Sequence, residues 1–355
     1  MVLEGKAIKI SQNSGELLFS AEKEQDRDLG TIIVLKYEPR EDPVRSIEVA
    51  IAPEFGSNMF HFQVGENNIF YCDRALLKDR DWTGNFPLWP LPNRVRNKKY
   101  EFEGQSVSLE DITRKRGNWP LIHGLVDDLM WDYEEPVVGS DFAAVKTHIC
   151  ITRNSREYQY FPYESKLTLE YRVTANSATI HYTVKNNEQK EQGKHMPFGF
   201  ALHPYFTTLS GKNETFVTLP ADYVMETDEA LLPTGRLIDV TNTGYDLRHP
   251  KAVGTLKLDT VFTGLHHDDR ASVDYRTLGM KVYLLASDEF THMVLYTLEN
   301  GFICFELQTG STDMINLYTR AMKEGNKALE HAAHLLILPP GQSHTGYISY
   351  QIEHY

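Results

Sequence analysis

Cysteine is scarce in this sequence, and long apolar runs are missing from it. The three cysteines, Cys72, Cys150 and Cys304, lie far apart with no CxxC pair, so neither a disulfide framework nor a thiolate metal site is indicated. No apolar run approaches the length that crosses a bilayer, and the first residues lack a basic segment followed by an apolar one. We therefore expect a cytoplasmic protein with no membrane contact.

Basic residues are also in the minority. Lys and Arg number 36 against 49 Asp and Glu, which gives a formal net charge of -13 at pH 7. A nucleic-acid surface needs clustered Lys and Arg to neutralise phosphates, so we expect no nucleic-acid partner. The hydrophobic fraction of 41% with 24% charged residues is ordinary for a globular protein. A neutral or weakly charged small ligand suits this composition best.

Cofactor and metal signatures are likewise lacking. The sequence contains no Gly-rich phosphate loop and no HExxH, GxSxG or protein-kinase motif. Two histidine clusters invite a metal assignment. Residues 266–269 have the composition of a solvated loop, and His331 with His334 has no carboxylate at ligand spacing. We predict no metal and no cofactor.

Short β-branched segments separated by polar residues, Gly or Pro recur along the whole chain, which is typical of strands. Strands are expected at 7–10, 31–37, 46–51, 69–72, 142–152, 165–175, 178–185, 215–219, 281–286, 293–298, 302–307, 335–338 and 346–352. Residues 100–107 alternate around a Gly and predict a hairpin, whereas the prolines within 85–97 predict an ordered loop. Helices are expected only at 74–78, 311–323 and 327–333. The prediction is an all-β protein, a single domain over residues 1–355 built as one large sandwich of antiparallel sheets.

Two of these apolar strands each carry one residue suited to proton transfer. His203 lies within the stretch 198–206, and Glu306 lies within 301–308. Imidazole titrates near neutrality, and a carboxylate among apolar groups has a raised pKa, which makes it a better base at neutral pH. Alone, His203 is explained as a satisfied core residue and Glu306 as half of a buried ion pair. Together they indicate an acid and a base.

Three further polar residues, Arg94, His123 and Asp259, are candidates for the same site. Each also has a purely structural explanation. Arg94 would form a surface ion pair, His123 would pack within a loop, and Asp259 would belong to a turn. Asp239 and Asp246 lie near Asp259 in the sequence and compete with it. The joint occurrence of these residues with His203 and Glu306 therefore matters more than any one of them.

The motifs around these residues resemble, in the same order, those of the aldose 1-epimerase (galactose mutarotase) family. The similar segments are Pro92-Asn93-Arg94-Val95 (sugar-binding loop), Ile122-His123-Gly124 (His-Gly element), His203-Pro204-Tyr205-Phe206 (catalytic acid), Leu258-Asp259-Thr260-Val261-Phe262 (substrate-binding Asp), Cys304-Phe305-Glu306-Leu307-Gln308-Thr309 (catalytic base) and Leu338-Pro339-Pro340-Gly341-Gln342 (C-terminal turn). They cover the chain from about Phe86 to its end. Two features depart from the family: Leu307 stands where Pro is common, and the insert 311–333 is long.

The resemblance implies a large twisted β-sandwich that binds a sugar across one open sheet and uses no cofactor. It implies Glu306 as the catalytic base and His203 as the catalytic acid. It further implies substrate binding by Asn93, Arg94, His123 and Asp259.

The implied reaction, interconversion of the anomers of a pyranose, opens a hemiacetal. A base takes the proton of the anomeric hydroxyl while an acid protonates the ring oxygen, and we place these two groups on opposite edges of the sugar. The roles reverse on closure after a half-turn about the bond from C1 to C2. The aromatic residues Trp89, Trp119, Tyr205 and Phe206 either stack on the sugar or fill the core.

Three alternatives stay open. A hexose-6-phosphate epimerase would bind phosphate through Arg94 and Arg96, with Lys98 and Lys99 nearby. A non-catalytic carbohydrate-binding protein would need no acid–base pair. A glycosidase would need two carboxylates, whereas Glu306 is the one evident strand carboxylate. The sequence indicates neither the identity of the sugar nor the oligomeric state.

Overall fold

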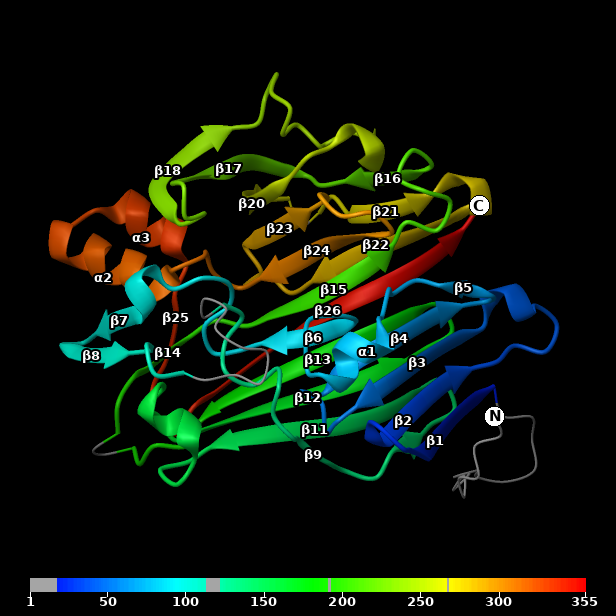
Figure 1. Ribbon diagram of the computed structural model, residues 1–355, viewed down its shortest axis with the longest axis horizontal. Helices are drawn as coiled ribbons and strands as arrows, with labels where there is room; N and C mark the ends of the chain where they lie inside the picture. Colours follow the sequence, from blue (N-terminus) through cyan, green and yellow to red (C-terminus); the bar gives the residue numbers. More distant parts are fainter. Residues whose placement is uncertain (1–17, 113–121, 191–192, 267) are drawn as a thin grey trace.

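The structure is a computed structural model that describes residues 18–112, 122–190, 193–266 and 268–355. Strands dominate, and those that form the larger sheets pair antiparallel (Figure 1). The predicted all-β class is confirmed. The strand expected at 7–10 lies outside the described residues.

Three sheets carry most of the described strands. The first, in the order β1-β2-β3-β4-β5, contains β1 (Phe19–Asp26), β2 (Gly30–Tyr37), β3 (Ile47–Ala52), β4 (Asn58–Val64) and β5 (Asn67–Asn68). The second, in the order β10-β11-β12-β13-β26-β22-β21-β16-β19 with β9 beside β11, contains β9 (Asp132–Tyr133), β10 (Val137–Val138), β11 (Ala143–Ile151), β12 (Ser165–Val173), β13 (Ser177–Asn186), β16 (Thr215–Thr218), β19 (Lys251–Ala252), β21 (Ala271–Tyr275), β22 (Met280–Ala286) and β26 (Ser343–His354). The third, in the order β18-β17-β20-β23-β24-β15-β6, contains β6 (Asn85–Leu88), β15 (Ala201–Thr207), β17 (Ala221–Thr227), β18 (Pro233–Asp239), β20 (Asp259–Leu265), β23 (His292–Tyr296) and β24 (Phe302–Gln308).

The remaining elements are short. Two strand pairs complete the described sheets, β7 (Lys99–Phe102) with β8 (Gln105–Ser108) and β14 (Met196–Phe198) with β25 (Leu336–Leu338). The helices are α1 (Arg74–Lys78), α2 (Met314–Glu324) and α3 (Lys327–Ala333), and the 3-10 turns are η1 (Pro43–Arg45), η2 (Arg96–Lys98), η3 (Arg156–Gln159), η4 (Val253–Thr255) and η5 (Arg276–Leu278). None of the described helices has the length and apolar character that crossing a bilayer demands.

One aromatic core joins the three sheets. Phe62 from β4, Tyr350 from β26 and Phe206 from β15 pack with ring centroids 5.8–6.0 Å apart around Tyr350. Phe70 meets Phe206 at 5.2 Å. β12 shows why such strands form, since its burial alternates residue by residue, as expected for one face on the core. One face of the seven-stranded sheet therefore packs on this core, and the side chains of its other face are available to form a site.

Several local predictions need correction. Residues 69–72 form no strand; Phe70 makes only an isolated bridge to Phe206. The proline-containing segment predicted as a loop begins with strand β6, because β6 lies at the edge of its sheet, where Pro87 removes no ladder bond on the open side. Helix α2 begins at Met314 rather than 311, since Asp313 has a left-handed backbone conformation. The predicted hairpin at 100–107 is confirmed as β7 and β8. The single domain over residues 1–355 stays a prediction.

Candidate active site

Strand register brings the predicted acid and base together. β15 and β24 pair antiparallel with Ala201 opposite Gln308 and Tyr205 opposite Cys304, and the same register places His203 opposite Glu306. Successive side chains of a strand point to opposite faces. The face of β15 and β24 that carries His203 and Glu306 therefore points away from the aromatic core.

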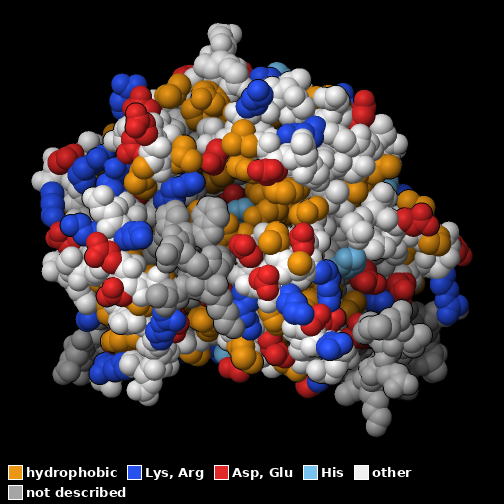
Figure 2. Space-filling model, in the orientation of Figure 1, with side chains coloured by type: hydrophobic (Ala, Val, Ile, Leu, Met, Phe, Trp, Pro, Cys, Tyr) orange, Lys and Arg blue, Asp and Glu red, His pale blue; other side chains and the backbone are white. Residues whose placement is uncertain are grey.

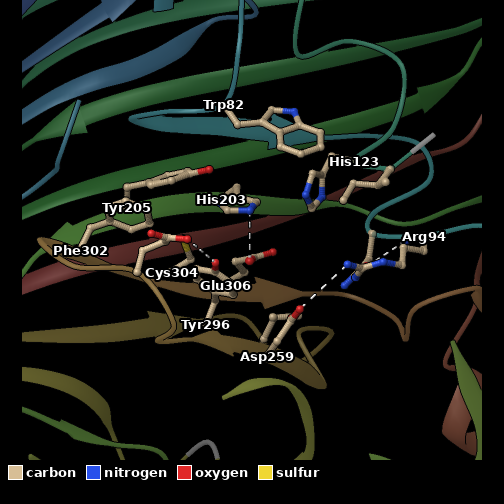
Figure 3. A pocket seen from close by; sticks show the side chains of 14 residues that line it. Trp82, Arg94, His123, His203, Tyr205, Asp259, Tyr296, Phe302, Cys304 and Glu306 are labelled. Carbon is tan, nitrogen blue, oxygen red and sulfur yellow. Dashed lines mark hydrogen bonds and ion pairs between the residues drawn. The ribbon is translucent and has the colours of Figure 1, made fainter. Parts of the chain in front are cut away.

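A pocket of about 220 Å³ lies over this face. It is hollowed into the centre of the surface shown in Figure 2, where apolar side chains gather among acidic ones. Figure 3 shows Arg94 and Asp259 on one side of Glu306, and Tyr205 and Phe302 on the other. The lining residues are Trp82, Asn93, Arg94, Ile122, His123, His203, Tyr205, Asp259, Val294, Tyr296, Glu299, Phe302, Cys304 and Glu306. The structure thus gathers all six sequence-predicted site residues in one pocket.

His203 and Glu306 are in direct contact. His203 Nε2 lies 3.2 Å from Glu306 Oε1, and their side chains are 7% and 4% exposed. The rings of Phe86 and Tyr205 both stack with the imidazole, with centroids 4.9 and 5.0 Å away. The proposed acid and base are therefore adjacent to each other, and their placement on opposite edges of a sugar stays a prediction.

Burial determines the acidity of Glu306. It raises the pKa of this carboxyl to about 8, and the negative charge of Asp259 acts in the same direction. A weak hydrogen bond from Gln308 Nε2 to Oε2 (3.4 Å) and the positive charge of Arg94 act in the opposite direction. A carboxylate with a pKa near neutrality is a much stronger proton acceptor than an exposed one.

Two loops that are distant in sequence hold the polar end of the pocket. The Arg94 guanidinium lies 4.0 Å from the Asp259 carboxylate and donates from Nη1 to Asn93 Oδ1 at 3.2 Å. The His123 backbone N–H donates to Asn93 O at 3.0 Å. Asn93 and His123 both have positive φ, 59° and 70°. Such conformations cost energy and occur preferentially at functional sites.

The glycine that follows His123 is required for steric reasons. Gly124 has φ of 80°, and a Cβ there would lie 2.4 Å from the Trp89 carbonyl oxygen. Any residue larger than glycine at position 124 would push the His123 segment away from the Trp89 segment. The close approach leaves the His123 ring edge-on to His203, with centroids 4.8 Å apart, and edge-on to Trp82 at 4.9 Å.

One group among the described residues has the geometry to hold a cation. Ligand atoms of His123, His203 and Glu306 lie within 4.8 Å of one another. The histidine clusters noted in the sequence do not form such a group there. His266 instead contacts Asp222 and Asp269 at 3.0 and 3.5 Å, while His267 lies outside the described residues. His334 Nδ1 lies 2.6 Å from Thr309 O.

The three candidate aspartates differ in position. Asp259 begins β20 and lines the pocket. Asp246 is instead bound to Arg248 at 2.7 Å, and Asp239 accepts from the Thr241 backbone at 2.7 Å. Of the three, Asp259 alone lines the pocket.

The aromatic residues proposed to stack on the sugar or to fill the core divide between these two positions. Tyr205 lines the pocket, but Trp89 and Phe206 are fully buried in the core. Trp119 lies outside the described residues. The sequence reasoning missed the other pocket aromatics, Trp82, Tyr296 and Phe302. Phe302 lies four residues before Glu306, so strand alternation could have suggested it; no sequence signal pointed to Trp82.

Comparisons with known proteins identify relatives of this chain. The aldose 1-epimerase family profile matches residues 46–351. Human galactose mutarotase is 28% identical over 186 residues, which cover 50% of this chain and 49% of that protein. Maltose epimerase of Levilactobacillus brevis is 24% identical over 170 residues, 47% of each chain. The matches thus span about half the length of these curated relatives.

Solved structures share the fold over nearly the whole chain. A galactose mutarotase-like protein from Clostridium acetobutylicum superposes with a TM-score of 0.73 at 19% identity, covering 91% of this chain and 96% of that one. Galactose 1-epimerase from Lactobacillus acidophilus gives 0.70 at 16% identity over 99% of both chains. Sequence identities this low are evidence for a shared fold alone. The family profile, however, extends over most of the sequence, and the chain belongs to the aldose 1-epimerase family.

Proposed function

We propose that this protein is an aldose 1-epimerase that interconverts the α and β anomers of an unphosphorylated hexose. The observation that carries the proposal is the buried contact between His203 Nε2 and Glu306 Oε1 at 3.2 Å. The two groups form an ion pair when the imidazole is protonated and the carboxyl is ionised. Such a pair can deliver one proton and accept another without any other reactant.

In the proposed reaction, Glu306 takes the proton of the anomeric hydroxyl as His203 protonates the ring oxygen. The bond between C1 and the ring oxygen breaks, and C1 becomes an aldehyde. After rotation about the bond from C1 to C2, the ring hydroxyl attacks the other face of the aldehyde. His203 then recovers its proton from that hydroxyl, and Glu306 returns its own to the new anomeric oxygen. Each group typically supplies about 10²–10⁴-fold of rate.

The polar end of the pocket supplies the remaining contacts. Arg94 and His123 would donate hydrogen bonds to oxygens on which charge develops, and Asp259 would accept from hydroxyls away from C1. Asn93, held at the same end by His123, offers a further hydroxyl contact. Tyr205 and Phe302 on the opposite side offer apolar ring faces to the sugar.

The phosphorylated alternative is less well supported by the charges. Arg96 does not line the pocket; it is bound to Asp228 at 2.9 Å and lies 3.7 Å from Asp313. Among the described lining residues, Arg94 is the lone Lys or Arg, whereas Asp259, Glu299 and Glu306 are acidic. Within the described part of the lining, a phosphate dianion would meet more acidic than basic side chains.

The other two alternatives differ from the proposal in chemistry. A protein that only binds sugar has no use for a buried carboxyl, whose desolvation is costly. The glycosidase alternative gains one observation, because Asp259 lines the pocket as a second carboxylate. Its contact with Arg94 suits hydroxyl binding better than bond cleavage.

Polarimetry on freshly dissolved α-D-glucose and α-D-galactose tests the proposal. We expect the protein to accelerate mutarotation of at least one sugar, to act less on the 6-phosphates and to release no nitrophenol from nitrophenyl glycosides. Dialysis against EDTA should leave the rate unchanged, because His203 and Glu306 account for both proton transfers. A loss restored by Zn²⁺ would instead assign His123, His203 and Glu306 as metal ligands. Wild-type protein that accelerates none of these reactions would refute the proposed activity.

Cytoplasmic location forms part of the same proposal. All three cysteines are free, and Cys72 and Cys304 lie at least partly buried. Free thiols of this kind persist in a reducing compartment.

A further inference from the structure

The insert between β24 and β25 has no part in the proton transfers, yet it packs beside the pocket. Helices α2 and α3 lie at one end of the seven-stranded sheet (Figure 1). Leu317 and Ala321 of α2, with Leu329 of α3, share an apolar cluster with Val261 and Val294. Val294 itself lines the pocket. The insert is therefore fixed to the strands that carry the site.

Asp313, the residue that precedes α2, is buried and polar but does not line the catalytic pocket. It is 4% exposed and has φ of 58°, an unfavourable conformation for a residue other than glycine. Its Oδ1 accepts from Asn316 Nδ2 at 2.7 Å. Burial raises the pKa of this carboxyl. A buried carboxylate in a strained conformation costs stability, which calls for a compensating contact.

Apart from Asn316, the compensating contacts come from the loop that carries Arg94. The Asp313 backbone N–H donates to Arg94 O at 3.1 Å, and Asp313 Oδ1 accepts from the Arg96 backbone N–H at 3.0 Å. Asp313 Oδ2 also lies 3.7 Å from Arg96 Nε. Asn316, which binds Asp313, donates to Lys99 O at 2.9 Å. Asp313 thus holds the backbone that follows the Arg94 side chain, from the Arg94 carbonyl to the Arg96 N–H.

The opposite edge of the same loop is held by the His123 segment. Arg94 forms a bridge with Ile122, and His123 donates its backbone N–H to Asn93 O. Arg94 is therefore clamped between a segment that belongs to the pocket and the start of α2. Only the second contact depends on a residue outside the pocket lining.

We propose that Asp313 is a positioning residue for sugar binding, which acts through Arg94. Its backbone and carboxylate fix the Arg94 loop so that the guanidinium faces Asp259 and the sugar hydroxyls before the sugar arrives. A preorganised loop loses less conformational entropy when the ligand binds. This inference rests on the proposed role of Arg94 in binding the substrate.

A double-mutant cycle between Arg94→Ala and Asp313→Ala tests the inference, with KM and kcat for D-galactose and D-glucose measured by polarimetry. We expect Asp313→Ala to raise KM about tenfold while kcat changes little, since charge-assisted hydrogen bonds are lost outside the reacting centre. Asp313→Asn, which keeps an acceptor oxygen, should recover part of the affinity. In the Arg94→Ala background, Asp313→Ala should have no further effect on KM.

Two variants guard against general loss of structure. Asn316→Ala removes one partner of Asp313 and should raise KM less than Asp313→Ala does. Lys323→Ala breaks the ion pair of α2 with Glu101 at 2.9 Å, which does not touch residues 93–96, and should leave KM unchanged. A KM that is unchanged in Asp313→Ala, or that rises equally with and without Arg94, would overturn the inference.

The same double-mutant cycle can be measured as the Kd for the sugar by calorimetry. This measurement separates the inference from the proposed function. A wild-type protein that binds galactose or glucose without accelerating mutarotation would refute the activity alone, and coupling between the two residues in Kd would still support the positioning role. A wild-type protein that binds neither sugar would overturn both.

Discussion

One histidine–carboxylate pair lies on the seven-stranded sheet and another joins β17 to the residue after β20; the two pairs differ in burial rather than in distance. His203 Nε2 lies 3.2 Å from Glu306 Oε1, and His266 Nε2 lies 3.0 Å from Asp222 Oδ1. The side chains of the first pair are 7% and 4% exposed, whereas those of the second are 38% and 43% exposed. The residue types and separations are thus nearly the same, but the solvent around them is not.

Burial changes which partner of the pair has a shifted pKa. In the exposed pair, the hydrogen bond with Asp222 raises the pKa of His266, as in an ordinary surface ion pair. In the buried pair, desolvation raises the pKa of Glu306 to about 8. Water stabilises both charges in the exposed pair, so little proton-transfer reactivity is gained there. The comparison teaches that the proposed acid–base chemistry comes from the apolar surroundings of the pair rather than from its residue types.

Glu306→Gln is expected to have the largest effect. The amide keeps the shape of the side chain but cannot accept a proton, so the mutarotation rate constant should fall by about 10²–10⁴-fold. Polarimetry gives the rate, and near-ultraviolet circular dichroism checks that the fold is retained. A variant with the wild-type rate would show that the buried carboxyl is not the base.

His203→Asn is expected to lower kcat almost as much, because the side chain that replaces the imidazole cannot donate and recover a proton near neutral pH. The matched control is His266→Asn, the same replacement in the exposed pair. We expect the control to stay within roughly twofold of the wild-type rate, as for an ordinary surface substitution. Equal losses in the two variants would remove the distinction between the pairs.

The sequence predicted the proposed residues better than it predicted their surroundings. Asn93, Arg94 and Asp259 were found from short motifs, and the strands that carry His203 and Glu306 were recognised from their apolar composition. Those strands are buried on both faces, so they show no alternation of polar and apolar residues. The sequence therefore could not show which side chains share a face; that followed from the register of β15 with β24.

Other features depend on contacts between distant segments. Trp89 packs on Phe161 in the core, whereas Trp82, seven residues earlier in the chain, lines the pocket. The edge position of β6, which tolerates Pro87, follows from the order of strands in the sheet. The left-handed conformation of Asp313, which delays α2, makes sense only with the Arg94 loop beside it. No local pattern carries such information.

The pH dependence of stability sharpens the comparison. The Glu306 pKa is about 8 in the folded protein and about 4.3 in an unfolded chain. Below the lower value the carboxyl is protonated in both states, and as pH rises toward the upper value the unfolded state ionises first. Wild-type protein should therefore lose stability relative to Glu306→Gln by an amount on the order of a few kcal/mol across this interval. Urea unfolding at several pH values measures the difference, and parallel curves would contradict the burial argument.

The smallest effect is expected from Asp222→Asn in the exposed pair. Because Asp222 raises the pKa of His266, its contribution to stability is present below about pH 6.5, the unfolded-state value, and is lost as pH rises through the folded-state value. The free energy of unfolding should fall by no more than about 1 kcal/mol at acidic pH, where solvent screens the pair and Asp269 remains as a second partner. Arg248, 3.9 Å from Asp222, keeps its closer contact with Asp246. Added salt should reduce the difference further. A loss comparable to that predicted for the buried carboxyl would mean that exposure does not separate the two pairs, and the proposed acid–base role would then need another physical basis.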